Sequence, residues 1–209
     1  AVGVLIALGI WQIRRGEEKA AQIALLAARS AQAPIEAPLR GEAALDFQPV
    51  QASGSFDHAR ELHVYGRSDR GSPGIHVVTP LKRGDGRGVV LVDRGFVPMD
   101  RVDPARRLSG QIEGVVSVAG IIRLPGERGL FTPANDPRRN NWYHIDPEEM
   151  GRAAGIAPAE LAPYLLVASS GVAGGPIGRP VAIDLAANHL HYALTWFALA
   201  AGLVAIFAV

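Results

Sequence analysis

The sequence contains no cysteine and only two methionines. The absence of thiols excludes disulfide bonds, thiol catalysis, thiolate metal sites and the CxxCH motif that attaches haem covalently. Because soft Cu(I) ions prefer thiolate and thioether ligands, the shortage of both residue types also argues against a copper chaperone.

Recognisable catalytic motifs are also lacking. The chain has no HExxH, GxSxG, Walker or deaminase pattern. A glycine series at 84, 86 and 88 is followed by no helix, so a hairpin turn at Asp85-Gly86 is favoured over a nucleotide-binding loop. The histidines before residue 150 are dispersed and lack a metal-binding spacing; they are His58, His63, His76 and His144. These absences predict that the protein is not an enzyme.

Charged residues are missing from both ends of the chain. The 21 Lys and Arg and the 20 Asp and Glu all lie between Arg14 and Asp184. A soluble domain spreads charge over its whole surface, so this partition predicts a membrane helix at each end. Residues 1–13 predict a truncated first transmembrane helix that continues as a juxtamembrane helix to about residue 28. Residues 190–209 predict a second span of about 20 residues, the length that a bilayer requires.

The middle of the chain, residues 40–180, predicts one soluble domain. Short alternating or apolar runs, such as Glu61–Tyr65 and Val89–Val92, are typical of strands separated by turns. Asp146-Pro147 with two following glutamates predicts the start of a short helix. The expected fold class is therefore a membrane protein of the α+β type, with two transmembrane helices flanking a mostly antiparallel β domain. A net charge of +1 argues against nucleic acid as a partner.

Two segments of the predicted domain carry candidate binding residues. Asp93-Arg94, at the end of a predicted strand, suits a ligand clamp, but a local ion pair at a tight turn is the favoured interpretation. Asn140–Tyr143 combines aromatic rings with amides, so a binding site and a packed loop corner are equally good interpretations.

A histidine at the mouth of the second predicted span, His189, is the strongest candidate. An imidazole there needs water, a hydrogen bond or a bound ligand, and imidazole is a common ligand of metals and haem iron. Helical spacing places Tyr192 and Trp196 on the same face, whereas His191 points about 200° away and cannot chelate the same ion. From periodicity alone, an interfacial histidine held by lipid headgroups is favoured over a ligand.

Several motifs together resemble a known family. They occur in order along nearly the whole chain: Leu8–Arg15 with Lys19; Val78–Leu81; Val92–Pro98; Asn141-Trp142 with Asp146; Gly178–Pro180; and Asn188-His189-Leu190-x-Tyr192-Ala193-x-Thr195-Trp196-Phe197. They resemble the surfeit locus protein 1 family of cytochrome oxidase assembly factors. This chain departs from the family pattern at Phe96, where Trp is commoner, and at His191, where Gln or Glu is usual.

The resemblance implies a function that composition and spacing do not. It implies an assembly factor for haem-copper cytochrome c oxidase that binds haem a transiently and assists its insertion into the catalytic subunit. The haem-associated histidine maps onto His189, with Tyr192 and Trp196 beside it; His191 is a second imidazole, and Arg94 is a candidate partner for a haem propionate. The alternative is a non-haem membrane scaffold that stabilises the catalytic subunit during assembly.

The resemblance also implies a setting. It places the domain in the periplasm of a bacterium, anchored in the inner membrane, with the mitochondrial inner membrane as the alternative. The implied partners are the oxidase catalytic subunit, the lipid bilayer and haem a synthase.

Overall fold

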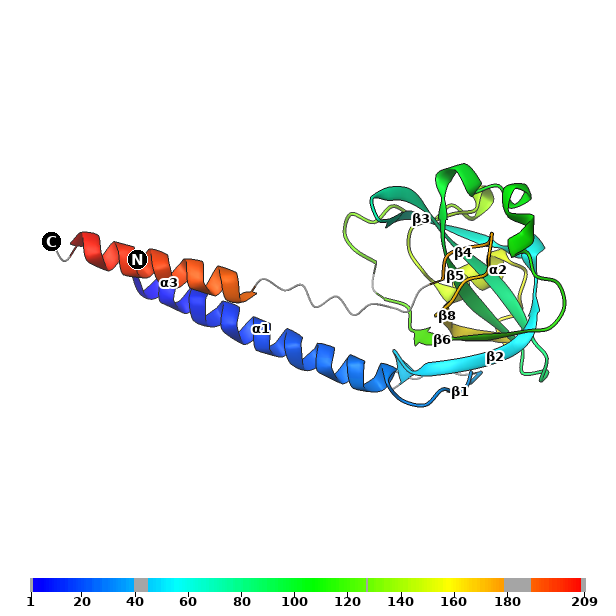
Figure 1. The fold of residues 1–209 in the computed structure, drawn as a ribbon, viewed down its shortest axis with the longest axis horizontal. Helices are drawn as coiled ribbons and strands as arrows, with labels where there is room; N and C mark the ends of the chain where they lie inside the picture. Colours follow the sequence, from blue (N-terminus) through cyan, green and yellow to red (C-terminus); the bar gives the residue numbers. More distant parts are fainter. Residues whose placement is uncertain (1, 40–44, 127, 179–188, 208–209) are drawn as a thin grey trace. The chain divides into compact units, whose positions relative to one another are not determined.

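The computed structural model describes residues 2–39, 45–126, 128–178 and 189–207 (Figure 1). The chain divides into two compact units. One is helical and combines Ala1–Arg29 with Ala182–Val209, and the other is the β-rich segment Ser30–Val181.

The described residues of the helical unit form two helices, α1 (Val2–Ser30) and α3 (His189–Phe207). They pack through small residues: Ala193 and Ala200 on α3 are buried, and a Cβ atom added at Gly9 of α1 would overlap the ring of Phe197. Gly9 therefore allows the close approach of the two helices.

The prediction of two transmembrane helices is wrong. In the described part of the chain, no helix combines the length and the apolar character that crossing a bilayer requires.

The β-rich unit is built on one sheet of eight strands in the described residues, in the order β1-β2-β6-β8-β5-β4-β3-β7 (Figure 1). The strands are β1 (Ile35–Glu36), β2 (Pro49–Phe56), β3 (Leu62–Asp69), β4 (Ser72–Arg83), β5 (Val89–Pro98), β6 (Val116–Arg123), β7 (Asn141–Trp142) and β8 (Leu161–Ala168). The helix α2 (Pro147–Ala153) precedes β8, and short 3-10 turns are formed by His58–Arg60, Met99–Arg101, Pro104–Gly110 and Pro137–Arg139.

An additional pairing closes part of this sheet. The end of β2 pairs with β4 as well as with β6, so that β2, β6, β8, β5 and β4, all among the described strands, form a five-strand barrel. The closure requires Gly54, because a Cβ atom there would overlap the Lys82 carbonyl group of β4. The barrel interior is filled by alternate side chains, including Val92, Tyr164 and Leu166.

The outer face of the barrel is also covered where β5 and β8 lie side by side. Leu91 and Leu165, whose neighbours point into the barrel, pack outward against Trp142 of β7 and Met150 of α2. Both faces of β5 are thus buried, which explains why Val89–Val92 is a continuous apolar run instead of an alternating one.

The predicted fold class also missed the topology of the sheet. The sheet is mixed, because β1, β7 and β8 pair in parallel with β2, β3 and β5. The direction of pairing depends on how the chain crosses the barrel between β5 and β8, and the alternation within one strand carries no information about that path.

Two local predictions are confirmed. The antiparallel strands β4 and β5 are joined by a turn in which Gly86 has a φ of 74°. The side chain of Asp146 caps α2 by accepting a 3.0 Å hydrogen bond from the Glu149 amide. Both features depend on neighbouring residues alone.

The two glycines Gly95 and Gly114 provide a test of the fold. Gly95 has a φ of 110°, and its Cβ would also strike the backbone of Ile177, which bridges to Phe96. Gly114 has a φ of 82° but open space around it. We expect Gly114→Ala to lower the free energy of unfolding by about 1–3 kcal/mol through backbone strain. Gly95→Ala should lower the free energy of unfolding further, because the backbone bridge between Phe96 and Ile177 must also shift. Equal losses in urea denaturation would contradict this account of Gly95.

Candidate functional site

The end of β5 places two buried ionisable side chains on opposite faces of the strand. Asp93 accepts hydrogen bonds from the Gly95 amide at 2.9 Å and from Nδ1 of His76 at 2.8 Å. Arg94 points the other way and does not contact Asp93. The favoured sequence interpretation, a local Asp93–Arg94 ion pair at a tight turn, is therefore wrong: both residues lie within the continuous strand β5.

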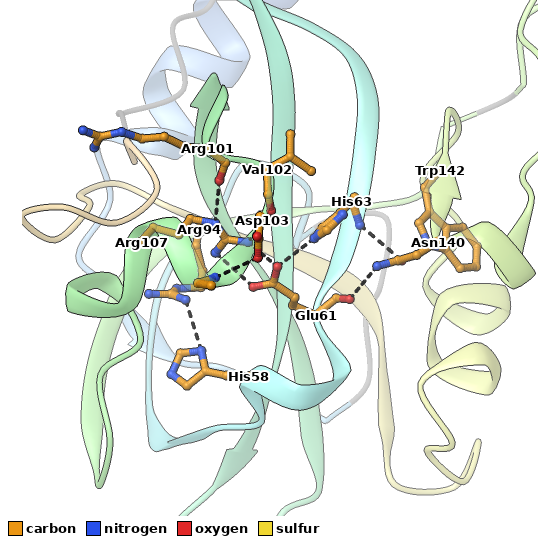
Figure 2. Close-up of polar contacts among 11 residues, drawn as sticks. His58, Glu61, His63, Arg94, Arg101, Val102, Asp103, Arg107, Asn140 and Trp142 are labelled. Carbon is orange, nitrogen blue, oxygen red and sulfur yellow. Dashed lines mark hydrogen bonds and ion pairs between the residues drawn. The ribbon is translucent and has the colours of Figure 1, made fainter. Parts of the chain in front are cut away.

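Arg94 is bound by neutral groups (Figure 2). It donates to the Gly110 carbonyl and, at 3.3 Å, to Nδ1 of His58, and its guanidinium lies 4.7 Å from the centre of the Phe56 ring. Because Nε2 of His58 lies 2.9 Å from the Ile112 carbonyl, which can only accept, His58 donates from Nε2 and accepts from Arg94. Burial lowers the pKa of Arg94, the charge of Glu61 raises it and that of Arg107 lowers it again. Arg94 nevertheless keeps its positive charge.

A second buried arginine, Arg107, lies close to Arg94 and is paired with a carboxylate (Figure 2). Both carboxylate oxygens of Glu61 accept from Arg107, one of them at 3.0 Å, and Arg107 also donates to the carbonyls of Arg101 and Val102. His63 adds a 2.7 Å contact to Glu61. Burial alone raises the pKa of Glu61, but the hydrogen bonds from His63 and Arg107, together with their charges, outweigh it and hold the pKa below its usual value.

Among the described residues of the β-rich unit, three arginines are at most 5% exposed, and they differ in their partners. Arg83 pairs with Asp85, and Arg107 pairs with Glu61. For Arg94, the described residues provide no carboxylate within 4.0 Å, and the nearby Glu61 is engaged by Arg107. A buried cation without an anion is costly, so Arg94 is prepared to bind one.

Arg94 also lines a pocket of about 100 Å³ at one end of the barrel, which we call the Arg94 pocket. Its walls come from the ends of β2, β5 and β8, the start of β6, and the segment after β8; they include Phe56, Ser117, Ala119, Ala168 and Gly171. Most of the lining is apolar, and Arg94 is its one charged residue among the described residues.

The segment Asn140–Tyr143 is a packed loop corner. Trp142 is fully buried, and its indole N–H donates to Oδ1 of Asn140 at 2.9 Å (Figure 2). Asn140 in turn donates to the Glu61 carbonyl at 2.9 Å. The same corner therefore supports the backbone of the Glu61 segment, and the buried ring of Trp142 is not available to stack on a ligand.

The remaining sequence candidates lie in the helical unit. His189 is the first residue of α3, and its side chain lies outside the described part of the structure. His191 is exposed, Tyr192 is 57% exposed, and Trp196 is half-buried. Arg94, the fifth candidate, belongs to the β-rich unit. No group of three potential metal-ligating side chains is found among the described residues.

The Glu61–Arg107 pair was not predicted from the sequence. The two residues are 46 positions apart, and neither lies in a recognisable motif. In the structure, Arg107 departs from helical geometry, with a φ of −143° and a ψ of 37°. This backbone conformation is a property of the folded chain, so the sequence offered no local signal for the pair.

Comparison with known proteins gives the same family that the sequence motifs resemble. Residues 1–201 match the SURF1 family, and the chain belongs to that family. It is 37% identical to surfeit locus protein 1 of Mus musculus and 36% identical to that of Homo sapiens, over 93% of this chain and 68% and 69% of those proteins. Surfeit locus protein 1 of Takifugu rubripes is 33% identical over 93% of this chain and 87% of its own length.

The buried ion pair leads to a prediction about stability. Glu61→Gln keeps the size of the side chain but leaves the charge of Arg107 buried and unbalanced, so the free energy of unfolding at pH 7 should fall by about 3–5 kcal/mol. The matched control is Glu148→Gln, whose exposed partner Arg152 is 3.8 Å away, and it should cost less than about 1 kcal/mol.

The same variant tests the direction of the pKa shift. Since the pKa of Glu61 in the folded state is below 4.5, its stabilising contribution is complete above pH 4.5 and is lost as the pH falls through the lower folded value. Glu61→Gln should remove this part of the acid dependence in urea denaturation measured at several pH values. An unchanged acid dependence in the variant would show that Glu61 is not the group concerned.

Proposed function

We propose that this chain is an assembly factor for haem-copper cytochrome c oxidase that receives haem a as cargo and assists its insertion into the catalytic subunit. The observation that carries the proposal is membership of the SURF1 family over residues 1–201, together with the His189–Phe197 motif within α3. Under this proposal the protein acts by binding and delivery, and it catalyses no reaction.

The donor groups of α3 are compatible with haem. Imidazole is a common axial ligand of haem iron, and His189 and His191 at the start of the helix both supply one. The exposed ring of Tyr192 and the half-buried ring of Trp196 would flank the macrocycle. Bound haem would supply the iron, and His189 or His191 would supply the nitrogen that holds it.

The β-rich unit has a different part in this proposal. The Arg94 pocket, with a volume of about 100 Å³, is too small to enclose a porphyrin, since pockets for drug-sized ligands measure about 300–1,000 Å³. The proposal therefore assigns the macrocycle to the α3 residues and not to the Arg94 pocket.

The alternative function is a scaffold that stabilises the oxidase catalytic subunit without binding haem. One observation favours it: Leu130 and Phe131 are 98% and 97% exposed. They occupy a turn in which the Thr132 amide donates to the Gly129 carbonyl and Arg128 donates twice to the Thr132 carbonyl. Adjacent large apolar side chains presented in this way are typical of contact surfaces.

The proposed partners are the oxidase catalytic subunit and haem a synthase. The similar proteins named above come from animals, which favours a mitochondrial location over the periplasm of a bacterium.

Haem spectroscopy on two single variants tests the function. The chain, purified after expression alongside haem a synthesis, should show a haem a absorption spectrum. His189→Ala should abolish or shift the spectrum, because an axial nitrogen is lost. His191→Ala is the matched control, two residues further along α3, and should leave the spectrum unchanged.

Each alternative outcome has its own meaning. A shifted spectrum in His191→Ala with a normal His189→Ala protein would move the ligand to His191. Haem-free wild-type protein that still copurifies with the catalytic subunit would replace the proposal with the scaffold function, and Leu130→Ser with Phe131→Ser should then abolish the copurification.

A further inference from the structure

The Arg94 pocket has the properties of a binding site for a small anion with an apolar body. Its buried charge, Arg94, is only 5% exposed and, among the described residues, has neutral partners alone. The guanidinium group carries five N–H donors, and the bonds to His58 and Gly110 engage two of its nitrogens. Donors therefore remain for a further acceptor.

The other buried arginines show that this arrangement is specific. Arg83 and Arg107 lie in the same unit at comparable burial, and each has a carboxylate from its own chain. A planar guanidinium matches a carboxylate through two parallel hydrogen bonds, which is the pairing that Arg107 makes with Glu61. Arg94 is the arginine of the three for which an external carboxylate would complete the same pattern.

The shape and lining of the pocket limit the size of the ligand. A cavity of about 150 Å³ holds benzene, so about 100 Å³ corresponds to roughly four or five non-hydrogen atoms. Apolar side chains such as Val118 and Ala168 suit an alkyl chain, and the hydroxyls of Ser117 and Ser170 are additional donors. Inorganic anions would leave the apolar walls without a partner.

We propose that the Arg94 pocket binds an alkyl carboxylate of about propionate size, with the guanidinium of Arg94 on the carboxylate and the apolar walls around the alkyl carbons. Two sources carry this chemistry: a free short-chain acid, and the propionate side chain of a porphyrin. The second source rests on the proposed haem function, whereas the first is independent of it.

The test is a titration of the whole ¹⁵N-labelled chain with sodium propionate at constant ionic strength, followed by NMR. We expect saturable shifts of the amides of Ser117, Ala119 and Gly171 and of Nε–H of Arg94, with a dissociation constant of about 1 mM for so few atoms. Propionamide, which has the same shape without the charge, should produce no saturable shift. Absence of saturation with propionate, or equal binding of propionamide, overturns the proposal.

Two arginine variants separate the pocket from general surface charge. Arg94→Met should weaken propionate binding at least about tenfold, because the charge-assisted hydrogen bonds are lost. Arg60→Met removes the same charge from an exposed side chain paired with Asp57, and it should bind propionate as the wild type does. An equal loss in Arg60→Met would show that binding is non-specific and would overturn the proposal.

A third variant covers the case in which Arg94→Met does not fold, since Arg94 also holds His58 and Gly110 in place. Ala119 is exposed on β6 and lines the pocket, so Ala119→Leu should narrow the pocket without disturbing the core. Weaker propionate binding with an unchanged circular dichroism spectrum is the expected result. Unchanged binding in this variant overturns the location of the site.

Competition distinguishes the two sources of the carboxylate. Protoporphyrin IX, but not its dimethyl ester, should displace propionate if a porphyrin side chain enters the pocket; no displacement by either assigns the pocket to a free acid. The haem a spectrum of Arg94→Met separates this inference from the proposed function. An unchanged spectrum with lost propionate binding supports the pocket independently, and a missing spectrum in the wild type with intact propionate binding removes only the haem proposal.

Discussion

The pairing of β2 with both β6 and β4 is the constraint on which the β-rich unit depends. Gly54 permits it, because a larger residue would collide with the backbone of Lys82. Closure turns the five strands from β2 to β4 into a barrel and buries alternate side chains inside it. It also brings Phe56, at the end of β2, over the guanidinium of Arg94 on β5, so that the same pairing builds the wall of the Arg94 pocket.

Buried positive charge is the second organising feature, and the buried arginines differ in whether a carboxylate balances them. Arg107 and Arg83 are balanced by carboxylates, and these pairs hold the segments around Glu61 and the β4–β5 turn in place. Arg94 is held by a carbonyl, an imidazole and an aromatic face, all of which leave its charge unbalanced. This difference in partners distinguishes an arginine that stabilises the fold from one suited to a ligand. A bound anion would stabilise the charge of Arg94, whereas the other two arginines already have a carboxylate.

Several parts of the protein were predictable from neighbouring residues. The turn at Asp85-Gly86 and the cap at Asp146 were predicted correctly, since a left-handed glycine and a side-chain cap act within three or four residues. Trp142 was recognised as important without its role, because burial in a corner and stacking on a ligand require the same ring. Arg94 was recognised as a candidate, but its expected partner was wrong: consecutive side chains on a strand point to opposite faces, and Asp93 faces His76.

The sequence by itself determined the family and the short-range turns and caps, because each depends on residue identity at fixed local spacing. Tertiary structure decided the closure of the barrel, the parallel placement of β8 beside β5, and the partners of the buried arginines. These features arise from contacts between residues far apart in the chain. Glu61 thus finds Arg107 across 46 positions, and Arg94 keeps an unbalanced charge beside a pocket.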